Sequence, residues 1–395
     1  MSLLTPEQLK IQQEAREFVA EYIIPVAAEW DRKGEFHEFI LPLAKKHNYF
    51  ACGVPKQFGG LGYSGLTQGI VLEEWGYGCA GFGTTLSASF LSMDSVLAFG
   101  NDEQKKIFFT PMVEGGIGAF GLTEPGAGSD VGAGSTRAVK DGDSYVINGT
   151  KCFITNGGYA SVYLVIASTD PAKGAKGLSA FIVTRGTPGL TVGDEMHKLG
   201  IRSSNTVELV FKNARVPASH RVGAEGEGMK VAMGTLEMAR PAIVALAVGL
   251  AQRTLDECVR YLHVKYPPAQ KVFPPQWVQF KLADMEIQIQ SARQLLYHAF
   301  ELRDAGCPYS KESSIAKAMC GDTGMRVTRD ALEILGSYGY SRECEVGKWA
   351  RDAKIMQIYE GTNEIQRLVV GRALLATPAR KEVASDHSKN VRGAA

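Results

Sequence analysis

One carboxylate near the C-terminal end of the sequence stands in a turn where it could act as a base. Glu360 follows Tyr359 and precedes Gly361. Gly361 permits a sharp backbone turn, and Thr362 or Asn363 can cap a following helix. This places Glu360 on a loop between two helices. A lone glutamate in a turn is usually solvated, so neighbouring residues must bring it into a site before it can remove a proton.

Two earlier segments carry side chains suited to a flat ligand. In the first, Gly126-Ala127-Gly128 lies between Thr123 and Ser129, so backbone N–H groups can approach a ligand closely and two hydroxyls can donate. In the second, Phe153 precedes Thr155 in a strand-like run, which could set an aromatic ring against a planar cofactor and a donor at its edge. Alone, the first pattern equally fits a loop between domains, and the second more often marks a plain buried strand.

Several common enzyme classes lack support. The glycine run at 126–132 places its third glycine one residue late for a dinucleotide-binding fingerprint, and no parallel βαβ unit surrounds it. A Walker lysine motif, a G-x-S-x-G motif and an H-E-x-x-H motif are absent, and the seven histidines are dispersed. We therefore expect no nicotinamide Rossmann enzyme, no P-loop ATPase and no metal site.

Composition narrows the setting. The chain has 395 residues, 45% hydrophobic and 22% charged, with a net charge of +1, so nothing favours nucleic acid or an anionic membrane. The seven cysteines include no C-x-x-C pair, which is typical of a reducing compartment. The longest apolar run, Ala242 to Ala251, is about half a membrane span. We expect a cytoplasmic enzyme, or a mitochondrial matrix enzyme if the chain is a processed eukaryotic one.

The elements that must position these residues fall into three groups. The first is helical: Thr5 is a capping residue, and Ile11, Ala15, Phe18 and Tyr22 recur at helical spacing. From Val139 to Phe211 the pattern changes to short strands split by turns, which predicts an antiparallel sandwich or barrel. Helices then return, and we expect them at 229–262 with a break near Pro241, and at 277–304, 313–335 and 363–375.

Together, Thr-Glu-Pro-Gly-Ala-Gly-Ser-Asp at 123–130, Lys151 to Gly158, and Tyr-Glu-Gly-Thr-x-x-Ile-Gln-Arg at 359–367 resemble the acyl-CoA dehydrogenase family. The resemblance covers about residues 5 to 376. It implies an α+β multidomain fold with an N-terminal α-helical domain (1–117), a central antiparallel β domain (118–228) and a C-terminal four-helix-bundle domain (229–395). It also implies FAD, an acyl-CoA substrate, an electron-transferring flavoprotein as acceptor and a homotetramer.

The resemblance further implies roles for individual residues. Glu360 would take the α-proton while hydride leaves Cβ for flavin N5, and its own backbone N–H would help to hold the enolate oxygen. Some relatives carry the base at the position of Ala239, which cannot act here. Substrate contacts are implied for Ser129, Arg240, Tyr359 and Gly361. The implied flavin contacts are Phe120, Leu122, Thr123, Gly128, Ser129, Phe153, Thr155, Thr362 and Glu364.

The chain departs from the family pattern where a neighbouring subunit's FAD tail is expected. Lys265 stands in place of an arginine, and Pro268-Ala269 in place of Phe-Gly, whereas Gln276 matches. Further on, Glu333 replaces a glutamine three residues before Gly336. Lysine cannot form the bidentate fork of arginine, and a glutamate near a pyrophosphate is unfavourable unless it pairs, for example with Lys265. The sequence therefore suggests altered or weakened FAD retention.

A polar residue also stands on a helix that lines the acyl pocket in the family. If residues 84–99 form a helix, Ser87, Leu91 and Asp94 share one face. The plainer interpretation is that Asp94 is solvated or paired with N–H groups. The sharper one is that it faces a short, cyclic or functionalised acyl chain and could serve as a second proton-transfer group.

The acyl group itself stays open, because short branched, linear and alicyclic chains all fit the motifs. Within the fold, an enoyl-CoA reductase or an acyl-CoA oxidase is an alternative. A non-catalytic CoA-binding subunit is a further one, against which the intact Glu360 argues.

Overall fold

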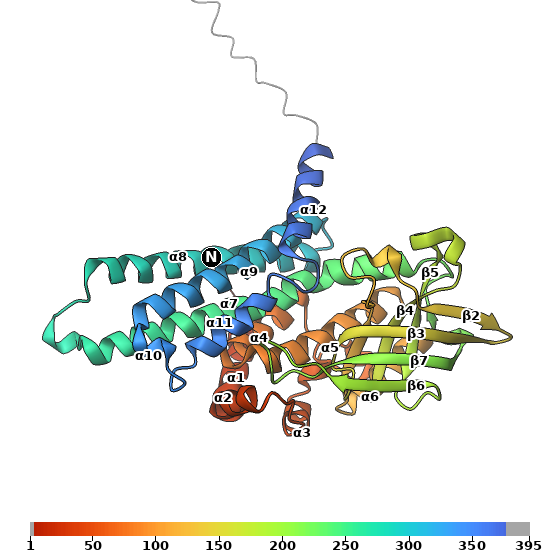
Figure 1. Ribbon diagram of the computed structural model, residues 1–395, viewed down its shortest axis with the longest axis horizontal. Coiled ribbons are helices and arrows are strands. Elements are labelled where there is room, and N and C mark those ends of the chain that lie inside the picture. The colour runs from red at the N-terminus through yellow and green to blue at the C-terminus, as the bar shows by residue number, and fades with distance from the viewer. Residues whose placement is uncertain (1–3, 377–395) are drawn as a thin grey trace, which may run out of the picture.

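The computed structural model describes residues 4–376, so the ends of the first and last predicted domains lie outside the described residues. Helices form one side of the molecule and a sheet the other, with long helices running between them (Figure 1). The N-terminal part is helical as expected. Its helices are α1 Pro6–Phe18, α2 Ile24–Lys33, α3 Ile40–Lys46, α4 Gly65–Gly78, α5 Ala80–Phe99 and α6 Asp102–Val113, with a π-helical turn, Val19–Ile23, between the first two.

The start of α1 confirms the capping prediction. The Gln8 backbone N–H donates to Thr5 Oγ1 at 3.2 Å, and the Thr5 N–H donates to Gln8 Oε1 at 2.9 Å, which satisfies two otherwise unpaired donors. Ile11, Ala15 and Phe18 are buried, so the helical face read from the sequence is the one that packs inward.

The central part is one largely antiparallel sheet. Its order is β6-β7-β3-β2-β4-β5-β8, and β1 pairs with β4. The strands are β1 Gly118–Gly121, β2 Arg137–Asp141, β3 Ser144–Thr155, β4 Val162–Ser168, β5 Leu178–Thr184, β6 Leu190–Glu195, β7 Thr206–Pro217 and β8 Arg221–Val222. The expectation of a wholly antiparallel arrangement needs one correction: β1 runs parallel to β4, and β2 meets β4 in parallel at Arg137 and Ser168.

The sheet has two buried faces. Along β4, Leu164 and Ile166 belong to the large core shared with the helices, whereas Tyr163 and Val165 belong to a second core with residues of β3 and β7. Alternate side chains of a strand point to opposite faces, so β4 is buried on both. The sheet thus curls over its own core and still packs against α5 and α7.

The C-terminal part is built on α7 Gly228–Lys265, α8 Gln276–Asp304 and α9 Ser310–Leu335, with α11 Val346–Ile355 packed beside them. The expected break near Pro241 is wrong, because α7 runs through it without interruption. Proline removes the N–H that would bond to the carbonyl of Glu237. Ser313 Oγ donates to that carbonyl instead, at 3.2 Å, so the helix continues without an unsatisfied acceptor there.

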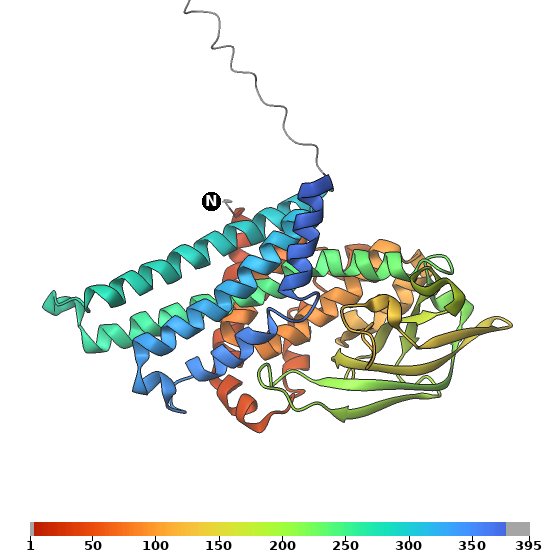
Figure 2. The same ribbon diagram turned by 45° about the horizontal axis from the view of Figure 1, so that its top comes forward.

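Two short helices were not foreseen from the sequence, α10 Ser337–Tyr340 and α11, and the last helix is α12 Asn363–Ala376. Figure 2 shows α7 and α8 reaching the end of the molecule that is farthest from the sheet. Among the described helices, α7 is long and apolar enough to meet a membrane-span test, but 72% of its most apolar window is buried inside the protein. Burial of this kind is expected of a core helix.

Candidate active site

Glu360 lies in the turn between α11 and α12, with its backbone in the left-handed region (φ 53°). That conformation is unusual for a residue other than glycine, and such residues concentrate at functional sites. Gln366, on the first turn of α12, holds the turn by donating from Nε2 to the carbonyls of Gly361 (2.9 Å) and Glu360 (3.4 Å). Thr362 Oγ1 accepts from the Ile365 N–H at 3.3 Å, which confirms the predicted cap.

The carboxylate of Glu360 is placed where its charge is costly. Its Oε2 atom is buried and has no hydrogen-bond partner within residues 4–376. Burial raises the pKa of Glu360 to about 8, although the nearby positive charges of Lys317 and Arg240 oppose that rise. A carboxyl group with a pKa near neutrality, and with an unused oxygen, is suited to accept a proton.

A buried lysine on α9, which sequence reasoning missed, supports the turn. Lys317 Nζ donates to Oδ1 of Asn363 at 3.0 Å, and Asn363 Nδ2 in turn donates to Asp322 at 2.8 Å. Gln357, just before the turn, also donates to Asp322, at 2.7 Å. Burial lowers the pKa of Lys317 to about 8, despite the attraction of Glu360. A lysine within the apolar run of a helix, Ala316-Lys317-Ala318, was the signal available in the sequence.

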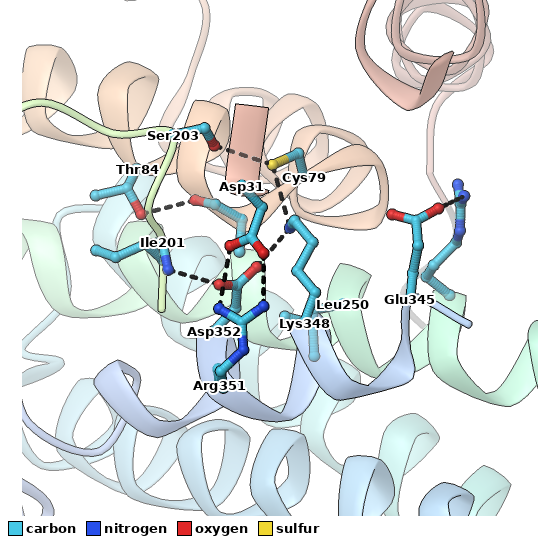
Figure 3. Close-up of polar contacts among 12 residues, drawn as sticks. Asp31, Cys79, Thr84, Ile201, Ser203, Leu250, Glu345, Lys348, Arg351 and Asp352 are labelled. Carbon is cyan, nitrogen blue, oxygen red and sulfur yellow. Dashed lines mark hydrogen bonds and ion pairs between the residues drawn. The ribbon is translucent and has the colours of Figure 1, made fainter. Parts of the chain in front are cut away.

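The helix that leads into the turn is anchored to other parts of the chain (Figure 3). Arg351 on α11 pairs with Asp31 on α2 through contacts of 3.1 and 2.5 Å. Asp352 accepts from Lys348 Nζ at 2.6 Å and from the Ile201 N–H at 2.5 Å, so it ties α11 to the loop between β6 and β7. Lys348 Nζ also lies 3.4 Å from Cys79 Sγ, at the start of α5. These contacts fix the position of α11, and therefore of Glu360.

Arg240 and Ala239 lie on α7, and both are buried. Arg240 donates to Ser314 Oγ at 3.3 Å and interacts electrostatically with Glu360. Burial lowers the pKa of the Arg240 guanidinium. The structure thus places the predicted substrate arginine beside the predicted base, with Ala239 adjacent and unable to ionise.

Helix α5 connects the turn of Glu360 to the sheet. The Tyr359 hydroxyl donates to Met356 Sδ at 2.8 Å and interacts with the side chain of Thr84, and burial raises its pKa. The next residue, Thr85, accepts through its carbonyl from Asn156 Nδ2 at 2.9 Å. Asn156 directly follows Thr155 at the end of β3. Consecutive residues of one helix therefore contact both predicted halves of the site.

Asp94 lies further along α5 and is not solvated as the plainer interpretation allowed. It is buried, and its Oδ2 accepts from Arg303 Nη2 at 2.6 Å, so the N–H pairing comes from an arginine of α8. Leu91 is half-buried and Ser87 is buried on the same helix.

The predicted cofactor loop after β1 is held by a buried ion pair that the sequence did not reveal. Lys151 Nζ lies 2.6 Å from Glu124 Oε1, and both side chains are 3% exposed. Glu124 also accepts from Ser135, through the backbone N–H at 2.6 Å and the hydroxyl at 2.8 Å. Burial opposes ionisation of Glu124, but Lys151 and these donors outweigh it and lower the pKa to about 2. The signal available in the sequence was a lysine directly before the apolar run Cys152-Phe153-Ile154 of a predicted strand.

The two predicted cofactor segments meet side by side. Lys151 Nζ donates to the carbonyl of Leu122 at 3.0 Å, and the Cys152 N–H donates to the carbonyl of Thr123 at 2.9 Å. Phe153 follows, with φ 57° and a side chain that is 67% exposed. Phe120 is buried near the end of β1, while Gly128 and Ser129 are exposed at the end of the loop.

Thr362 and Glu364 border a cavity of about 310 Å³ that is also lined by residues of α9 and α11, where Lys354 and Arg367 supply positive charge and Asp322 negative charge. Glu364 lies at the start of that helix, and its pKa is lowered, chiefly by a backbone hydrogen bond.

The residues predicted to contact the FAD tail belong to the long C-terminal helices α7, α8 and α9 or to their ends. Lys265 ends α7 and Gln276 begins α8, at the end far from the sheet (Figure 2). The sequence suggested Lys265 as a partner for Glu333, but the two do not pair. It pairs instead with Lys281 of α8, with Nζ–Oε2 at 2.7 Å, because α8 and α9 pack side by side. Gly336 ends α9 with a positive φ of 57°.

Comparison with known proteins agrees with this arrangement. Models of the N-terminal, middle and C-terminal domains of acyl-CoA dehydrogenase match residues 5–116, 119–214 and 226–375. The mitochondrial short-chain specific acyl-CoA dehydrogenase of Rattus norvegicus is 41% identical over 92% of this chain and 89% of its own length. An acryloyl-CoA reductase (NADH) of Anaerotignum propionicum is 40% identical over 94% of this chain and 95% of its own.

Among solved structures, butyryl-CoA dehydrogenase from Megasphaera elsdenii superposes with a TM-score of 0.90 and 41% identity, covering 95% of this chain and all of the other. Three domain models in order, together with relatives similar along nearly their whole length, cover most of the described residues. The chain therefore belongs to the acyl-CoA dehydrogenase family of FAD-dependent oxidoreductases.

Proposed function

We propose that this protein dehydrogenates an acyl-CoA thioester to the 2-enoyl-CoA, with Glu360 as the base that removes the α-proton. The observation that carries this assignment is the buried Oε2 atom of Glu360, which lacks a donor within the described chain and belongs to a carboxyl group whose pKa is raised to about 8. A base with a pKa near the working pH combines a useful ionised fraction with enough basicity to accept the proton. Arg240 lies beside it and would help to place the CoA thioester.

The residues around the cofactor loop fit FAD. Phe153 presents an exposed aromatic face in a constrained backbone conformation. Apart from the adjoining residues, no described atom lies within 4 Å of a Cβ built at Gly126 or Gly128, so a ligand can approach that backbone. We expect Leu122, Thr123, Ser129 and Thr155 to hold the flavin with them. Bound FAD would accept the hydride from Cβ. The backbone N–H of Glu360 is the donor that we assign to the enolate oxygen.

Flavin reduction tests this proposal directly. The purified protein, loaded with FAD, is mixed without oxygen with a panel of linear, branched and alicyclic acyl-CoA thioesters. Bleaching of the flavin absorbance by at least one thioester, together with a 2-enoyl-CoA product, is expected. A protein that binds CoA thioesters but whose flavin is bleached by none would instead be a non-catalytic CoA-binding subunit.

The direction of the reaction is a separate question, because one similar protein is named an acryloyl-CoA reductase. We propose the dehydrogenase direction with electron-transferring flavoprotein as acceptor, in the cytoplasm or the mitochondrial matrix. Steady-state rates with that flavoprotein, with oxygen and with NADH plus an enoyl-CoA distinguish a dehydrogenase, an oxidase and a reductase. The dehydrogenase assignment requires the first rate to exceed the other two.

We also propose a homotetramer in which a neighbouring subunit completes the FAD site. The end of α7, the connector that follows it and the first half of α8 expose large apolar side chains, and a cluster of this kind marks an interaction surface. They are Val264, Val272, Phe273, Trp277, Phe280 and Ile287. Lys265, Gln276, Glu333 and Gly336 belong to the same helices or to the end of α9 beside them. Light scattering should give four protomers, and Trp277→Lys should reduce both the assembly and the FAD content. A monomer with full FAD content would contradict the proposal.

A further inference from the structure

Two ion pairs join α8 to earlier helices, one to α4 and one to α5. They differ in whether both oxygens of the carboxylate accept a hydrogen bond. The Glu73–Arg293 pair, with side chains 7% and 15% exposed, is fully engaged. Glu73 Oε1 accepts from Arg293 Nε at 2.8 Å, and Oε2 accepts from the Tyr297 hydroxyl at 2.9 Å. Arg293 also donates to Gln252 at 3.0 Å. This is the arrangement expected of a purely structural buried pair.

The Asp94–Arg303 pair is equally buried, at 5% and 15% exposure, but incomplete. Asp94 Oδ2 accepts from Arg303 Nη2, whereas the buried Oδ1 accepts from no part of the chain that the structure describes. A buried carboxylate oxygen without a donor is costly, and such atoms often mark a site for a ligand. One acceptor is therefore available at this point.

The free oxygen belongs to a face of α5 that includes one partly exposed side chain. Leu91 is half-buried, although every other residue from 80 to 96 is buried, so the helix borders open space there. Asp94 follows Leu91 by three residues and shares its face. Ser87 shares that face too, and its hydroxyl also lacks a partner within the described chain.

The same pair also contacts the helix that carries the active-site arginine. Arg303 Nη1 donates to the carbonyl of Met238 at 3.2 Å, two residues before Arg240 on α7. Tyr309 interacts electrostatically with Arg303 and Asp94 as well as with Arg240. Thr84, which contacts Tyr359, lies ten residues before Asp94, or about 15 Å along the helix axis. The pair thus includes a residue of the same helix as Thr84 and contacts the helix that carries Arg240, so it is joined to the surroundings of Glu360 through α5 and α7.

We infer that Asp94 and Arg303 form the floor of the acyl pocket and select an acyl group that carries a neutral hydrogen-bond donor, a hydroxyl, at its distal end. This rests on the proposed function. The hydroxyl would donate to Asp94 Oδ1. An alkyl end of the same length would leave that oxygen unpaired beneath it. A second carboxylate would meet the charge of Asp94, and an ammonium group would meet the charge of Arg303, so a neutral donor fits best.

Matched pairs of substrates test the assignment. Alkyl acyl-CoAs and their ω-hydroxy counterparts, from about four to about eight carbons, are compared by kcat/KM and by calorimetric Kd of the enoyl products. A site built to hydrogen-bond a hydroxyl discriminates strongly against an analogue that lacks it. At one chain length, the wild-type protein should prefer the hydroxylated substrate by at least about tenfold.

The double variant Asp94→Leu/Arg303→Leu replaces the pair by apolar side chains and leaves no unpaired charge. It should reverse the preference and bind the alkyl product more tightly. The control Glu73→Leu/Arg293→Leu removes the complete pair of equal burial, and the preference should stay that of the wild type. Flavin content and melting temperature establish that both variants fold.

Two results overturn the inference: a wild-type preference for the alkyl substrate at every length, or an unchanged preference in the Asp94/Arg303 variant that has folded. Neither result touches the proposed function, which fails only if no acyl-CoA of either series reduces the flavin. Asp94→Asn serves where the double variant fails to fold. Because the amide side chain of that variant retains an acceptor oxygen, its preference should fall without reversing, and an unchanged preference again counts against the inference.

Discussion

The buried ammonium of Lys317 donates a 3.0 Å hydrogen bond to Oδ1 of Asn363, the first residue of α12 and the third after Glu360. Lys317 belongs to α9, so this bond joins the base-bearing turn to a helix of the bundle core. It also brings a positive charge close to a carboxylate that burial would otherwise keep protonated. One residue thus both holds the turn and favours the ionised form of the base.

Replacing Lys317 with Met should shift the pH dependence of turnover toward higher pH. Lys317 lowers the pKa of Glu360, so removing its charge should raise that pKa above about 8. Lys317→Arg keeps the charge and serves as the control. The measurement is kcat against pH for flavin reduction, and a Lys317→Met profile that stays in place or moves to lower pH would contradict the role.

Glu360→Gln should abolish most of the turnover while leaving the flavin bound. Glutamine has nearly the same shape but cannot accept the α-proton, and general-base catalysis typically contributes about 10²–10⁴-fold. Glu237, the other carboxylate that interacts with Arg240, provides the comparison. Glu237→Gln should stay within a few fold of wild type, and the assignment of the base would be wrong if it proved the more damaging change.

The same substitution should alter the pH dependence of stability. The folded pKa of Glu360, about 8, lies above its ordinary value of 4.5, so the folded state holds the proton more tightly than the unfolded chain. Stability is therefore lost as pH rises through that interval. Glu360→Gln lacks this loss, so its melting temperature relative to wild type should increase from about pH 5 to about pH 9. A difference that is constant with pH would refute the shift.

Lys151→Met should destabilise the protein strongly, because it leaves Glu124 charged, buried and without its main partner. Breaking a buried pair in this way costs about 3–5 kcal/mol. Lys10 pairs with Glu14 on the exposed face of α1, and Lys10→Met should cost at most about 0.5 kcal/mol. Denaturant titration of both variants measures the contrast, and equal effects would mean that the Lys151 pair is unimportant.

Phe153→Ala should weaken FAD binding but leave the stability of the protein without cofactor nearly unchanged, because the ring is largely exposed. Aromatic contacts are worth about 0.5–1.5 kcal/mol, which corresponds to roughly 2- to 12-fold in Kd. Phe153→Trp keeps an aromatic face and should bind FAD at least as well as wild type. Flavin fluorescence titration gives both constants, and an Ala variant that binds FAD as tightly as wild type would exclude the ring contact.

Local patterns predicted the elements well where burial on one face decides the structure. The cap at Thr5 and the face of Ile11, Ala15 and Phe18 depend on neighbouring residues alone, and both appear as expected. Pro241 shows the limit of such reasoning. Its effect depends on whether a distant side chain can satisfy the freed carbonyl, and Ser313 does so from another helix.

The candidate site shows the same difference between features set by neighbouring residues and features set by distant ones. The motifs identified the turn of Glu360 and the loop after β1, because their glycines and hydroxyl groups are local features. The residues that hold them in place, Lys317 and Lys151, act across long separations in sequence. Glu333 pairs with Lys281 for a similar reason, since helix packing rather than proximity in sequence chose its partner.

The unbroken course of α7 has a mechanical consequence. At 38 residues it is about 57 Å long, and it packs against the sheet at one end and against α8 and α9 along the rest. A rod shared by both halves leaves no hinge between them, so the helical bundle and the β layer must move as one body. Substrate can then enter only by local rearrangement of side chains and of the short segments around Glu360 and Gly126. Substrate entry and catalysis therefore depend on the same few residues.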